Sequence, residues 1–232
     1  WGMTHLFGGS HARQSVSEAS GLVKLKGESE SLSLATASYG VLGAVGWEGI
    51  ARMKLEPGKV LLVFGLGMLG LLAGRVAQSL GVRVVGVNRS AWKRDVAKEF
   101  GFDAVAAPEA GEIQKAVGAL GGGDAVLAYD TTGSQEVLDL ALASLGTGGE
   151  LSLGGYYPGK YAIDYDLCHG KNLRIHNPVG PGSYLGKFTG LVEGGLDADA
   201  LIRTRVKPEG VAAFYAELIG DHSKFLGAVI EW

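Results

Sequence analysis

A turn built on three glycines is the feature of the sequence with the clearest chemical meaning. The apolar run Val60–Phe64 is followed by the spacing G-x-G-x-x-G and then by a helical pattern. In such turns the first glycine allows a sharp bend, the second lets the backbone approach a diphosphate, and the third lets the helix pack on the strand. Free N–H groups at the start of the helix would bind the phosphate oxygens. The residues expected to line the phosphates are Gly65, Gly67, Met68, Leu69 and Gly70.

The residues after the next apolar run, Val82–Val87, indicate which dinucleotide the turn would hold. About 20 residues beyond the glycines, an Asp or Glu usually accepts hydrogen bonds from the adenosine ribose of NAD. Here Asn88, Arg89 and Ser90 stand in that place, and their side chains can donate hydrogen bonds to a 2′-phosphate. Lys93 adds positive charge nearby. We therefore expect NADP(H) to be preferred, while NAD(H) stays open as an alternative.

Two further predicted strands end in residues that could meet the same ligand, because open α/β sheets bind ligands at the carboxyl ends of their strands. Asp130 and Thr131 follow one strand and offer polar groups to a ribose. Gly154 and Gly155 follow the next strand and offer bare backbone to a carboxamide. Ordinary turn chemistry is the alternative interpretation for each pair and for the glycine turn itself.

Short apolar runs alternate with helical patterns, which predicts a doubly wound parallel α/β sheet of about six strands. A helical stretch at 28–53, split near Gly40–Gly43 by its glycines, precedes the sheet. The predicted strands are a separate Leu22–Leu25, and then Val60–Phe64, Val82–Val87, Ala104–Val105, Ala125–Tyr129, Glu150–Leu153 and Leu173–His176. The predicted helices are Met68–Leu80, Ala91–Phe100, Glu109–Leu120, Gln135–Leu145 and Leu185–Glu193. Beyond this alternation come Ile202–Val206, a helix at Gly210–Ile219 and a strand at Leu226–Trp232.

Composition excludes several classes of function. The chain has 232 residues, 39 of them Gly, and 47% of its residues are hydrophobic, so a folded core is expected rather than disorder. The formal net charge of −3 provides no electrostatic footprint for nucleic acid or an anionic membrane. A single cysteine, Cys168, excludes an internal disulfide framework and a zinc site of several thiolates. With no signal-peptide pattern and no apolar run of roughly 18 residues, a cytoplasmic location is expected.

The motifs follow one another in an order that runs over nearly the whole chain. A glycine-bearing helix with Gly46, Trp47 and Gly49 leads to a turn at Pro57-Gly58 and then to the three-glycine turn. This order resembles the medium-chain dehydrogenase/reductase superfamily, which includes the zinc-type alcohol dehydrogenases. Within it, the run GGYY at 154–157 and the ending at 227–232 look most like the bacteriochlorophyllide a dehydrogenase branch.

The resemblance implies a division of the chain into domains. Residues 7–12 look like the last part of the family's GroES-like catalytic domain, so we expect the front of that domain to precede Trp1. The expected boundaries are 1–35 for the remnant of the catalytic domain, 36–180 for the dinucleotide-binding Rossmann domain, and 181–232 for a segment returning towards the catalytic domain.

The resemblance also implies roles for single residues at the nicotinamide end of the cofactor. The residues that would border or approach the nicotinamide are Gly154, Gly155, Tyr156, His176 and Asn177. Lys224 falls where family members often place a base that faces a phosphate. Zinc-type members commonly take one metal ligand from a Cys just before the Rossmann domain, and Tyr39 or Gly40 stands there in this chain. We therefore expect no zinc to be held by this chain.

No residue stands out in the sequence as the proton donor of a reaction. Tyr156 and Lys160 imitate the pair of short-chain dehydrogenases, which needs both side chains on one helical face, but Pro158-Gly159 between them disfavours a helix. His176, at the end of a predicted strand, is the second weak candidate beside Tyr156. A structural hydrogen bond is the alternative role for His176.

These observations lead to two main functional hypotheses. The first is an NADP(H)-dependent oxidoreductase that transfers a hydride between nicotinamide and a carbonyl, an alcohol or an activated alkene of a small-molecule substrate. The second is a module that binds the cofactor without independent catalysis. A nucleotide-sensing or S-adenosylmethionine-binding domain is a third alternative, against which the third glycine of the turn argues. A homodimer stays open.

Overall fold

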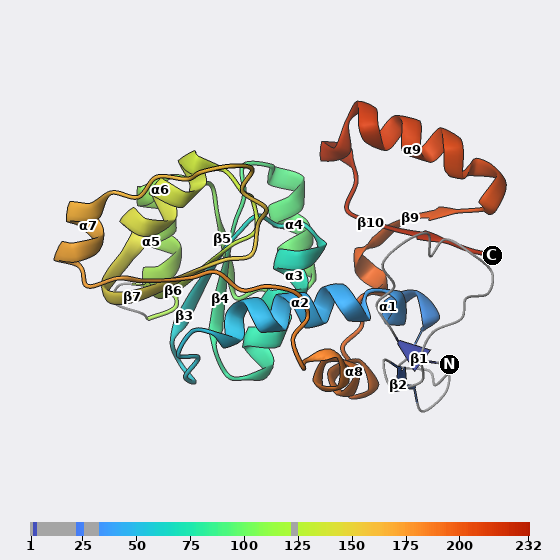
Figure 1. Ribbon diagram of the computed structural model, residues 1–232, viewed down its shortest axis with the longest axis horizontal. Coiled ribbons are helices and arrows are strands. Elements are labelled where there is room, and N and C mark those ends of the chain that lie inside the picture. The colour runs from blue at the N-terminus through green and yellow to red at the C-terminus, as the bar shows by residue number, and fades with distance from the viewer. Residues whose placement is uncertain (1, 4–21, 26–32, 122–124) are drawn as a thin grey trace. The chain divides into compact units, whose positions relative to one another are not determined.

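The computed structural model describes residues 2–3, 22–25, 33–121 and 125–232, and it divides into two compact units (Figure 1). Val45–Gly182 form the larger unit, and Trp1–Ala44 together with Ser183–Trp232 form the smaller one. The boundary between Ala44 and Val45 falls inside the helix α2 (Gly40–Ala51). The expected domain boundaries near 35 and 180 stay predictions. The expectations for 7–12 and for the start of the helical stretch at 28 concern residues outside the described ranges.

A six-stranded parallel sheet forms the centre of the larger unit (Figure 1). Its strands are β3 (Val60–Phe64), β4 (Arg83–Val87), β5 (Ala104–Ala106), β6 (Ala125–Asp130), β7 (Leu145–Leu153) and β8 (Arg174–His176). They lie in the order β5-β4-β3-β6-β7-β8, and every neighbouring pair is parallel. The direction of winding therefore reverses between β3 and β6, which is where open α/β sheets bind ligands. The predicted doubly wound α/β fold is confirmed.

Helices cover both faces of this sheet, as the apolar strands require. The helices of the larger unit are α3 (Met68–Ser79), α4 (Ala91–Glu99), α5 (Ala110–Ala119), α6 (Gln135–Ser144) and α7 (Tyr165–Gly170). On one face, the alternate residues Val60, Leu62 and Phe64 of β3 pack with Ile113 of α5 and Leu138 of α6 in one buried core. The strand β3 is buried along its whole length, so both faces of the sheet are covered at its centre.

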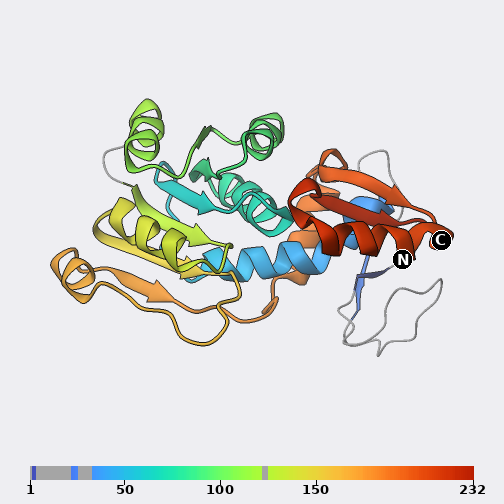
Figure 2. The same cartoon turned by 90° about the horizontal axis from the view of Figure 1, so that it is seen from above.

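Within the described residues, the smaller unit has two short sheets, and three α-helices besides its share of α2 (Figure 2). Its strands are β1 (Gly2–Met3) and β2 (Val23–Lys24), which are antiparallel, and β9 (Ile202–Val206) and β10 (Gly227–Ile230), which are parallel. Its helices are α1 (Leu34–Ser38), α8 (Leu185–Glu193) and α9 (Val211–Gly220). Asp199 joins the two ends of the chain here, since it accepts a hydrogen bond from Ser33 and one of 2.6 Å from Thr36. Burial raises the pKa of Asp199, but these hydrogen bonds and Arg205 outweigh it and lower the pKa overall.

Three local predictions differ from the structure. The helical stretch is interrupted at Tyr39, and α2 continues through Gly40 and Gly43 instead of breaking there. The backbone of Leu145 is already extended, so α6 ends at Ser144 and β7 begins five residues earlier than expected. The helix α7 was not predicted; Asp164 begins it by accepting the N–H of Leu167 at 2.9 Å.

The side chain of Tyr129 on β6 determines how closely α2 approaches the sheet. Tyr129 is fully buried, and a Cβ on Gly49 of α2 would lie 2.4 Å from its hydroxyl oxygen, while one on Gly154 would lie at 2.1 Å. Ser152 of β7 holds the same helix by donating a 2.6 Å hydrogen bond to the carbonyl of Gly49. Among the described residues, the Tyr129 hydroxyl is a buried polar group without a hydrogen-bond partner. Burial, together with the nearby charge of Asp130, raises the pKa of Tyr129, so the phenol stays neutral.

Replacing Tyr129 with Phe removes a buried hydroxyl that no hydrogen bond compensates. We expect the free energy of unfolding, measured by urea denaturation, to stay unchanged or to rise by about 1 kcal/mol. The control is Ser152→Ala, which deletes the hydrogen bond to Gly49 and should lower it by about 1 kcal/mol. Equal losses in the two variants would show that the Tyr129 hydroxyl has a partner.

Candidate functional site

The turns that follow the central strands are joined to one another by short hydrogen bonds. The amide of Gly65, after β3, donates to the carbonyl of Val87 at the end of β4 at 3.0 Å. On the other side, the amide of Thr131, after β6, donates to the carbonyl of Phe64 at 2.9 Å, and its hydroxyl donates to Phe64 and Gly65. The carboxyl ends of β3, β4 and β6, each followed by predicted site residues, are therefore linked to one another at the edge where the winding of the sheet reverses.

The glycine turn has the geometry that close approach of a ligand requires. Gly65 has φ +91°, a conformation that L side chains rarely adopt. A Cβ on Gly70 would lie 2.1 Å from the carbonyl oxygen of Gly65, so only glycine allows α3 to begin this close to β3. A Cβ on Gly67 would instead have no described atom within 4 Å. The second glycine thus borders open space at the start of α3.

The first turn of α3 leaves its N–H groups available to a ligand. Gly67 is the N-cap residue and has no side chain to accept a hydrogen bond from this turn, and no acidic side chain stands in the turn. Met68 and Leu69 follow it as the first helical residues. The unsatisfied N–H groups and the helix dipole make such an N-terminus a binding site for anions.

The turn after β4 presents positive charge. Asn88 accepts the amide of Ser90 on its side-chain oxygen at 2.9 Å, which fixes the turn. Arg94 reaches back to donate to the carbonyls of Asn88 and Arg89 at 2.6 and 3.0 Å. The Arg89 side chain is exposed, and Lys93 is half-buried. Burial, and to a smaller extent the charge of Arg89, lowers the pKa of Lys93.

The carboxylate of Asp130 is turned into the protein. Asp130 is fully buried at the end of β6, and Oδ1 accepts hydrogen bonds from the amide and the hydroxyl of Thr132, both at 2.8 Å. Its other oxygen, Oδ2, accepts a hydrogen bond from the hydroxyl of Tyr157. Burial raises the pKa of Asp130, and these hydrogen bonds only partly oppose that effect. Both carboxylate oxygens thus accept hydrogen bonds from within the chain. In this geometry the carboxylate does not face the ligand edge, where a ribose would bind.

The residues after β7 lie against the turn after β6. The amides of Gly154 and Gly155 both donate to the carbonyl of Asp130, at 2.8 and 2.9 Å. The side chain of the following residue, Tyr156, is 86% exposed. No helix forms between Tyr156 and Lys160, as expected from the proline and glycine between them.

The two candidates at the end of β8, His176 and Asn177, make contacts of different kinds. The Nε2 atom of His176 lies 2.8 Å from Oε2 of the buried Glu150, which is two residues before Ser152, the register partner of His176. The imidazole ring therefore reaches back along the sheet, away from the carboxyl ends of the strands. Asn177 is exposed, and its side-chain oxygen accepts a 3.1 Å hydrogen bond from Tyr161.

The remaining candidates lie in the smaller unit and do not form a metal site. Lys224 is 3.3 Å from Asp221. Tyr39 donates a 2.8 Å hydrogen bond to the carbonyl of Ala228, and burial raises its pKa despite that hydrogen bond, so it stays a neutral phenol. Within the described ranges, no three His, Cys, Asp or Glu side chains gather as metal ligands. The described residues therefore do not fit a zinc ion.

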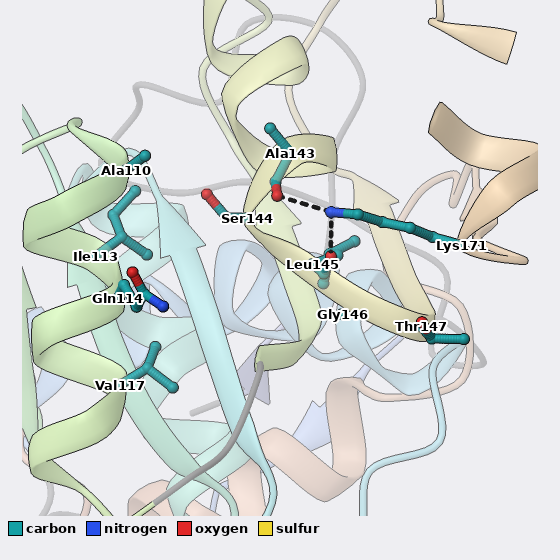
Figure 3. Close-up of a pocket in the computed structure, with 10 residues that line it drawn as sticks. All are labelled: Ala110, Ile113, Gln114, Val117, Ala143, Ser144, Leu145, Gly146, Thr147 and Lys171. Atoms are coloured by element: carbon teal, nitrogen blue, oxygen red, sulfur yellow. Dashed lines mark hydrogen bonds between the residues drawn. The ribbon is translucent and has the colours of Figure 1, made fainter. Parts of the chain in front are cut away.

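A cavity of about 280 Å³ lies at the opposite edge of the sheet (Figure 3). It is bordered by Ile113 and Val117 of α5 and by Leu145 at the beginning of β7. The Lys171 ammonium group, on its rim, donates hydrogen bonds to the carbonyls of Ala143 and Leu145 at 2.9 and 2.6 Å. These contacts satisfy carbonyl groups at the end of α6, and none of the predicted site residues borders the cavity.

Two tyrosines in the segment after β7 were missed in the sequence. Tyr157 contacts Asp130, and Tyr161 contacts Asn177, and their rings lie 5.4 Å apart. Tyr157 is next to the candidate Tyr156, but no residue spacing marks it as a partner of Asp130. The contact arises because the loops after β6 and β7 meet in space.

Comparison with known proteins identifies the family of the chain. The family model for zinc-binding dehydrogenases matches residues 69–193, which is more than half of the chain. The chain belongs to the zinc-binding dehydrogenase family. The predicted membership of the medium-chain dehydrogenase/reductase superfamily is thereby confirmed. The finer assignment to the bacteriochlorophyllide a dehydrogenase branch stays a prediction.

Individual relatives match part of their own length. An L-threonine 3-dehydrogenase from Pyrococcus horikoshii is 35% identical over 126 residues, which cover 53% of this chain and 36% of that protein. A short chain alcohol dehydrogenase from Escherichia coli, complexed with NADH, has a TM-score of 0.79 at 17% identity, covering 92% of this chain and 63% of the other. A zinc-binding dehydrogenase from Sinorhizobium meliloti, bound to NADP, has a TM-score of 0.76 at 20% identity, with coverages of 87% and 60%. The two solved structures show the same fold.

No described helix is both long and apolar enough to cross a membrane.

The raised pKa of Asp130 predicts a specific dependence of stability on pH. Since the folded chain holds this proton more tightly than the unfolded chain, whose carboxyl has its ordinary pKa of 3.8, folding gains most from Asp130 below that value. The gain is lost as the pH rises through the raised pKa. Relative to Asp130→Asn, the wild-type free energy of unfolding in urea denaturation should therefore fall as the pH rises from about 4 towards neutral. A difference between the two proteins that is constant over this range would contradict the burial of the carboxylate.

Proposed function

We propose that this chain is the cofactor-binding part of a nicotinamide-dependent oxidoreductase, with NADP(H) preferred over NAD(H). Membership of the zinc-binding dehydrogenase family supports this proposal, as do relatives named as dehydrogenases and similar structures that hold NADH or NADP. The matched stretch covers only 36% of the threonine dehydrogenase. The activity and the substrate of the protein to which this chain belongs are therefore also proposals.

The open space beside Gly67 is the observation that carries the proposal. The diphosphate of the cofactor would lie there, against the N–H groups of Gly67, Met68 and Leu69, because a ligand can approach the backbone closely only where no Cβ intervenes. Gly65 and Gly70 would act by shaping the turn, since their own Cβ positions are filled by other parts of the chain. The residues thus fit a dinucleotide.

The positive charge after β4 supports the choice of NADP(H). Arg89 is exposed and can offer a charged fork to a 2′-phosphate, while Lys93 adds a second cation beside it. Asn88 and Ser90 complete the turn with side chains that can donate hydrogen bonds. In this part of the chain, no carboxylate stands in the place from which one would bind the ribose of NAD and repel the phosphate of NADP.

The bound cofactor would accept or supply a hydride at its nicotinamide ring, and a small molecule with an alcohol, carbonyl or activated alkene would be its partner in the reaction. The contribution of this chain is to bind and orient the cofactor: Gly154, Gly155 and Tyr156 would border the ring, with Asn177 near it. We propose that Asp130 holds the backbone of Gly154 and Gly155 through hydrogen bonds instead of contacting a ribose. Thr131 would hold the glycine turn through its hydrogen bonds to Phe64 and Gly65. The assignment of Lys224 to a phosphate stays a prediction that rests on the resemblance.

A cofactor-binding module without independent catalysis is the second candidate. The two weak candidates for a proton donor favour it. Tyr156 is 86% exposed, and the His176 ring is hydrogen-bonded to Glu150. The proton donor of the reaction would then come from outside this chain. A cytoplasmic location completes the proposal and rests on the sequence pattern, while a homodimer stays open as an alternative.

Direct binding tests the proposal. We expect a titration of the chain with NADPH and with NADH, followed by nicotinamide fluorescence, to show binding of both and tighter binding of NADPH. No binding of either would refute both candidate functions.

Gly67→Ala should separate cofactor binding from folding. The added methyl group meets no described atom but fills the space assigned to the diphosphate, so affinity for NADPH and NADH should fall together by about tenfold or more. The melting temperature should fall by no more than about 2–4 °C, because alanine is a poorer N-cap residue than glycine. The matched control is Gly111→Ala in α5, where a Cβ also meets nothing within 4 Å. Unchanged affinity in Gly67→Ala would remove the diphosphate from this turn.

Arg89→Ala should separate the two cofactors. It is expected to weaken NADPH by about tenfold or more, because it removes a charged hydrogen bond to the 2′-phosphate, and to leave NADH within about twofold. Lys98→Ala, which removes an exposed cation from the far end of α4, is the control. Equal effects of Arg89→Ala on both cofactors would refute the assignment of Arg89 to the phosphate.

A further inference from the structure

We propose that Tyr157 is a positioning residue: its hydrogen bond to the buried Asp130 holds the backbone of Gly154–Tyr156 at the place where the nicotinamide ring is bound. This inference rests on the proposed function and adds to it a residue that does not touch the cofactor itself. It also gives a role to Asp130, whose carboxylate is turned away from the ligand edge.

Asp130 joins two loops through its backbone and its side chain. Its carbonyl accepts the amides of Gly154 and Gly155 at 2.8 and 2.9 Å, and its Oδ2 accepts the hydroxyl of Tyr157. On the other side, Oδ1 accepts two hydrogen bonds from Thr132. Three of the four residues 154–157 in the loop after β7 are thus hydrogen-bonded to Asp130.

The cost of an unpaired buried charge makes the hydrogen bond from Tyr157 necessary. Asp130 is fully buried, and among the described residues Tyr157 is the donor to Oδ2. A buried carboxylate oxygen that loses its donor must find another donor or move towards water. Without the Tyr157 hydroxyl, the lost hydrogen bond would favour a shift of the carboxylate, and the loops hydrogen-bonded to Asp130 would shift with it.

Direct contact between the backbones transmits such a shift. A Cβ on Gly133 would lie 2.1 Å from the carbonyl oxygen of Tyr156, and a Cβ on Gly155 would lie 2.4 Å from the amide nitrogen of Gly133. No side chain fits between the two loops, so one cannot move without the other. The orientation of the Gly154–Tyr156 backbone, which would border the nicotinamide, then depends on the Asp130–Tyr157 hydrogen bond.

The position of Tyr157 suits this role better than that of its neighbour. Tyr157 is half-buried and packs against the apolar core between the sheet and the helices α5 and α6, whereas Tyr156 is 86% exposed. Burial and the interaction with Asp130 raise the pKa of Tyr157, so it remains a hydrogen-bond donor at neutral pH. The two adjacent tyrosines would therefore have different roles: Tyr156 would face the ligand edge, and Tyr157 would hold the loop.

The test is Tyr157→Phe, which deletes one hydroxyl oxygen, compared with Tyr165→Phe as a matched control. Tyr165 is 68% exposed in α7 and stacks on His169, away from Asp130. Two probes are titrated: NADPH, and 2′,5′-adenosine diphosphate, which carries the adenosine half of the cofactor but no nicotinamide. Nicotinamide fluorescence at saturation reports how the ring is held.

Tyr157→Phe is expected to weaken NADPH about tenfold, to reduce the fluorescence of bound NADPH, and to leave 2′,5′-adenosine diphosphate within about twofold of wild type. Tyr165→Phe should change none of these. If Tyr157→Phe does not fold, Asp130→Asn, which weakens the same hydrogen bond, is expected to give the same selective loss.

Unchanged NADPH binding, or equal losses for both probes, would overturn the role of Tyr157. Failure of the wild-type chain to bind either probe would instead overturn the proposed function, so the two failures are distinguishable.

Discussion

The approach of the helix α3 to the strand β3 is the constraint on which the candidate site depends. At Gly70 the two elements come so close that a single added carbon would lie 2.1 Å from the carbonyl of Gly65. This contact places the first turn of α3 directly at the end of β3, where the winding of the sheet reverses. It also leaves the space beside Gly67 open and its N–H groups unpaired by any capping side chain. A contact between small residues inside the fold thereby leaves the start of α3 open at the edge where we propose that the diphosphate binds.

The rest of the site is connected to this turn by backbone hydrogen bonds. Gly65 bonds to the end of β4, Thr131 bonds to the end of β3, and the loop after β7 bonds to Asp130 at the end of β6. Each bond links one strand to its neighbour in the sheet, so the turns form one continuous edge instead of four independent loops. The expected phosphate end and nicotinamide end of the ligand lie on parts of the same connected backbone.

Local sequence patterns predicted the sheet well because each strand is buried and bounded by turns. Val60–Phe64 and Leu185–Glu193 have the expected bounds, and the glycine spacing correctly predicts a strand, a tight turn and a helix in succession. The partners of polar side chains were not predictable in this way, since Asp130 and Tyr157 are 27 residues apart and meet only because β6 and β7 are neighbours. For the same reason, the chain pattern suggested Asp130 as a ribose contact, although its carboxylate faces inwards. His176 likewise ends a strand as expected but bonds to Glu150, which the sequence does not indicate.

Backbone amide resonances offer the most direct test of whether a dinucleotide binds across the turn between β3 and α3. Assigned nitrogen–proton spectra of the wild-type chain should be recorded while NADPH is added to saturation. We expect the largest shifts at Gly67, Met68 and Leu69, with a second group at Gly154 and Gly155, and no shift at Thr147 on the opposite edge of the sheet. Saturable binding that leaves Gly67–Leu69 unshifted would contradict binding across this turn.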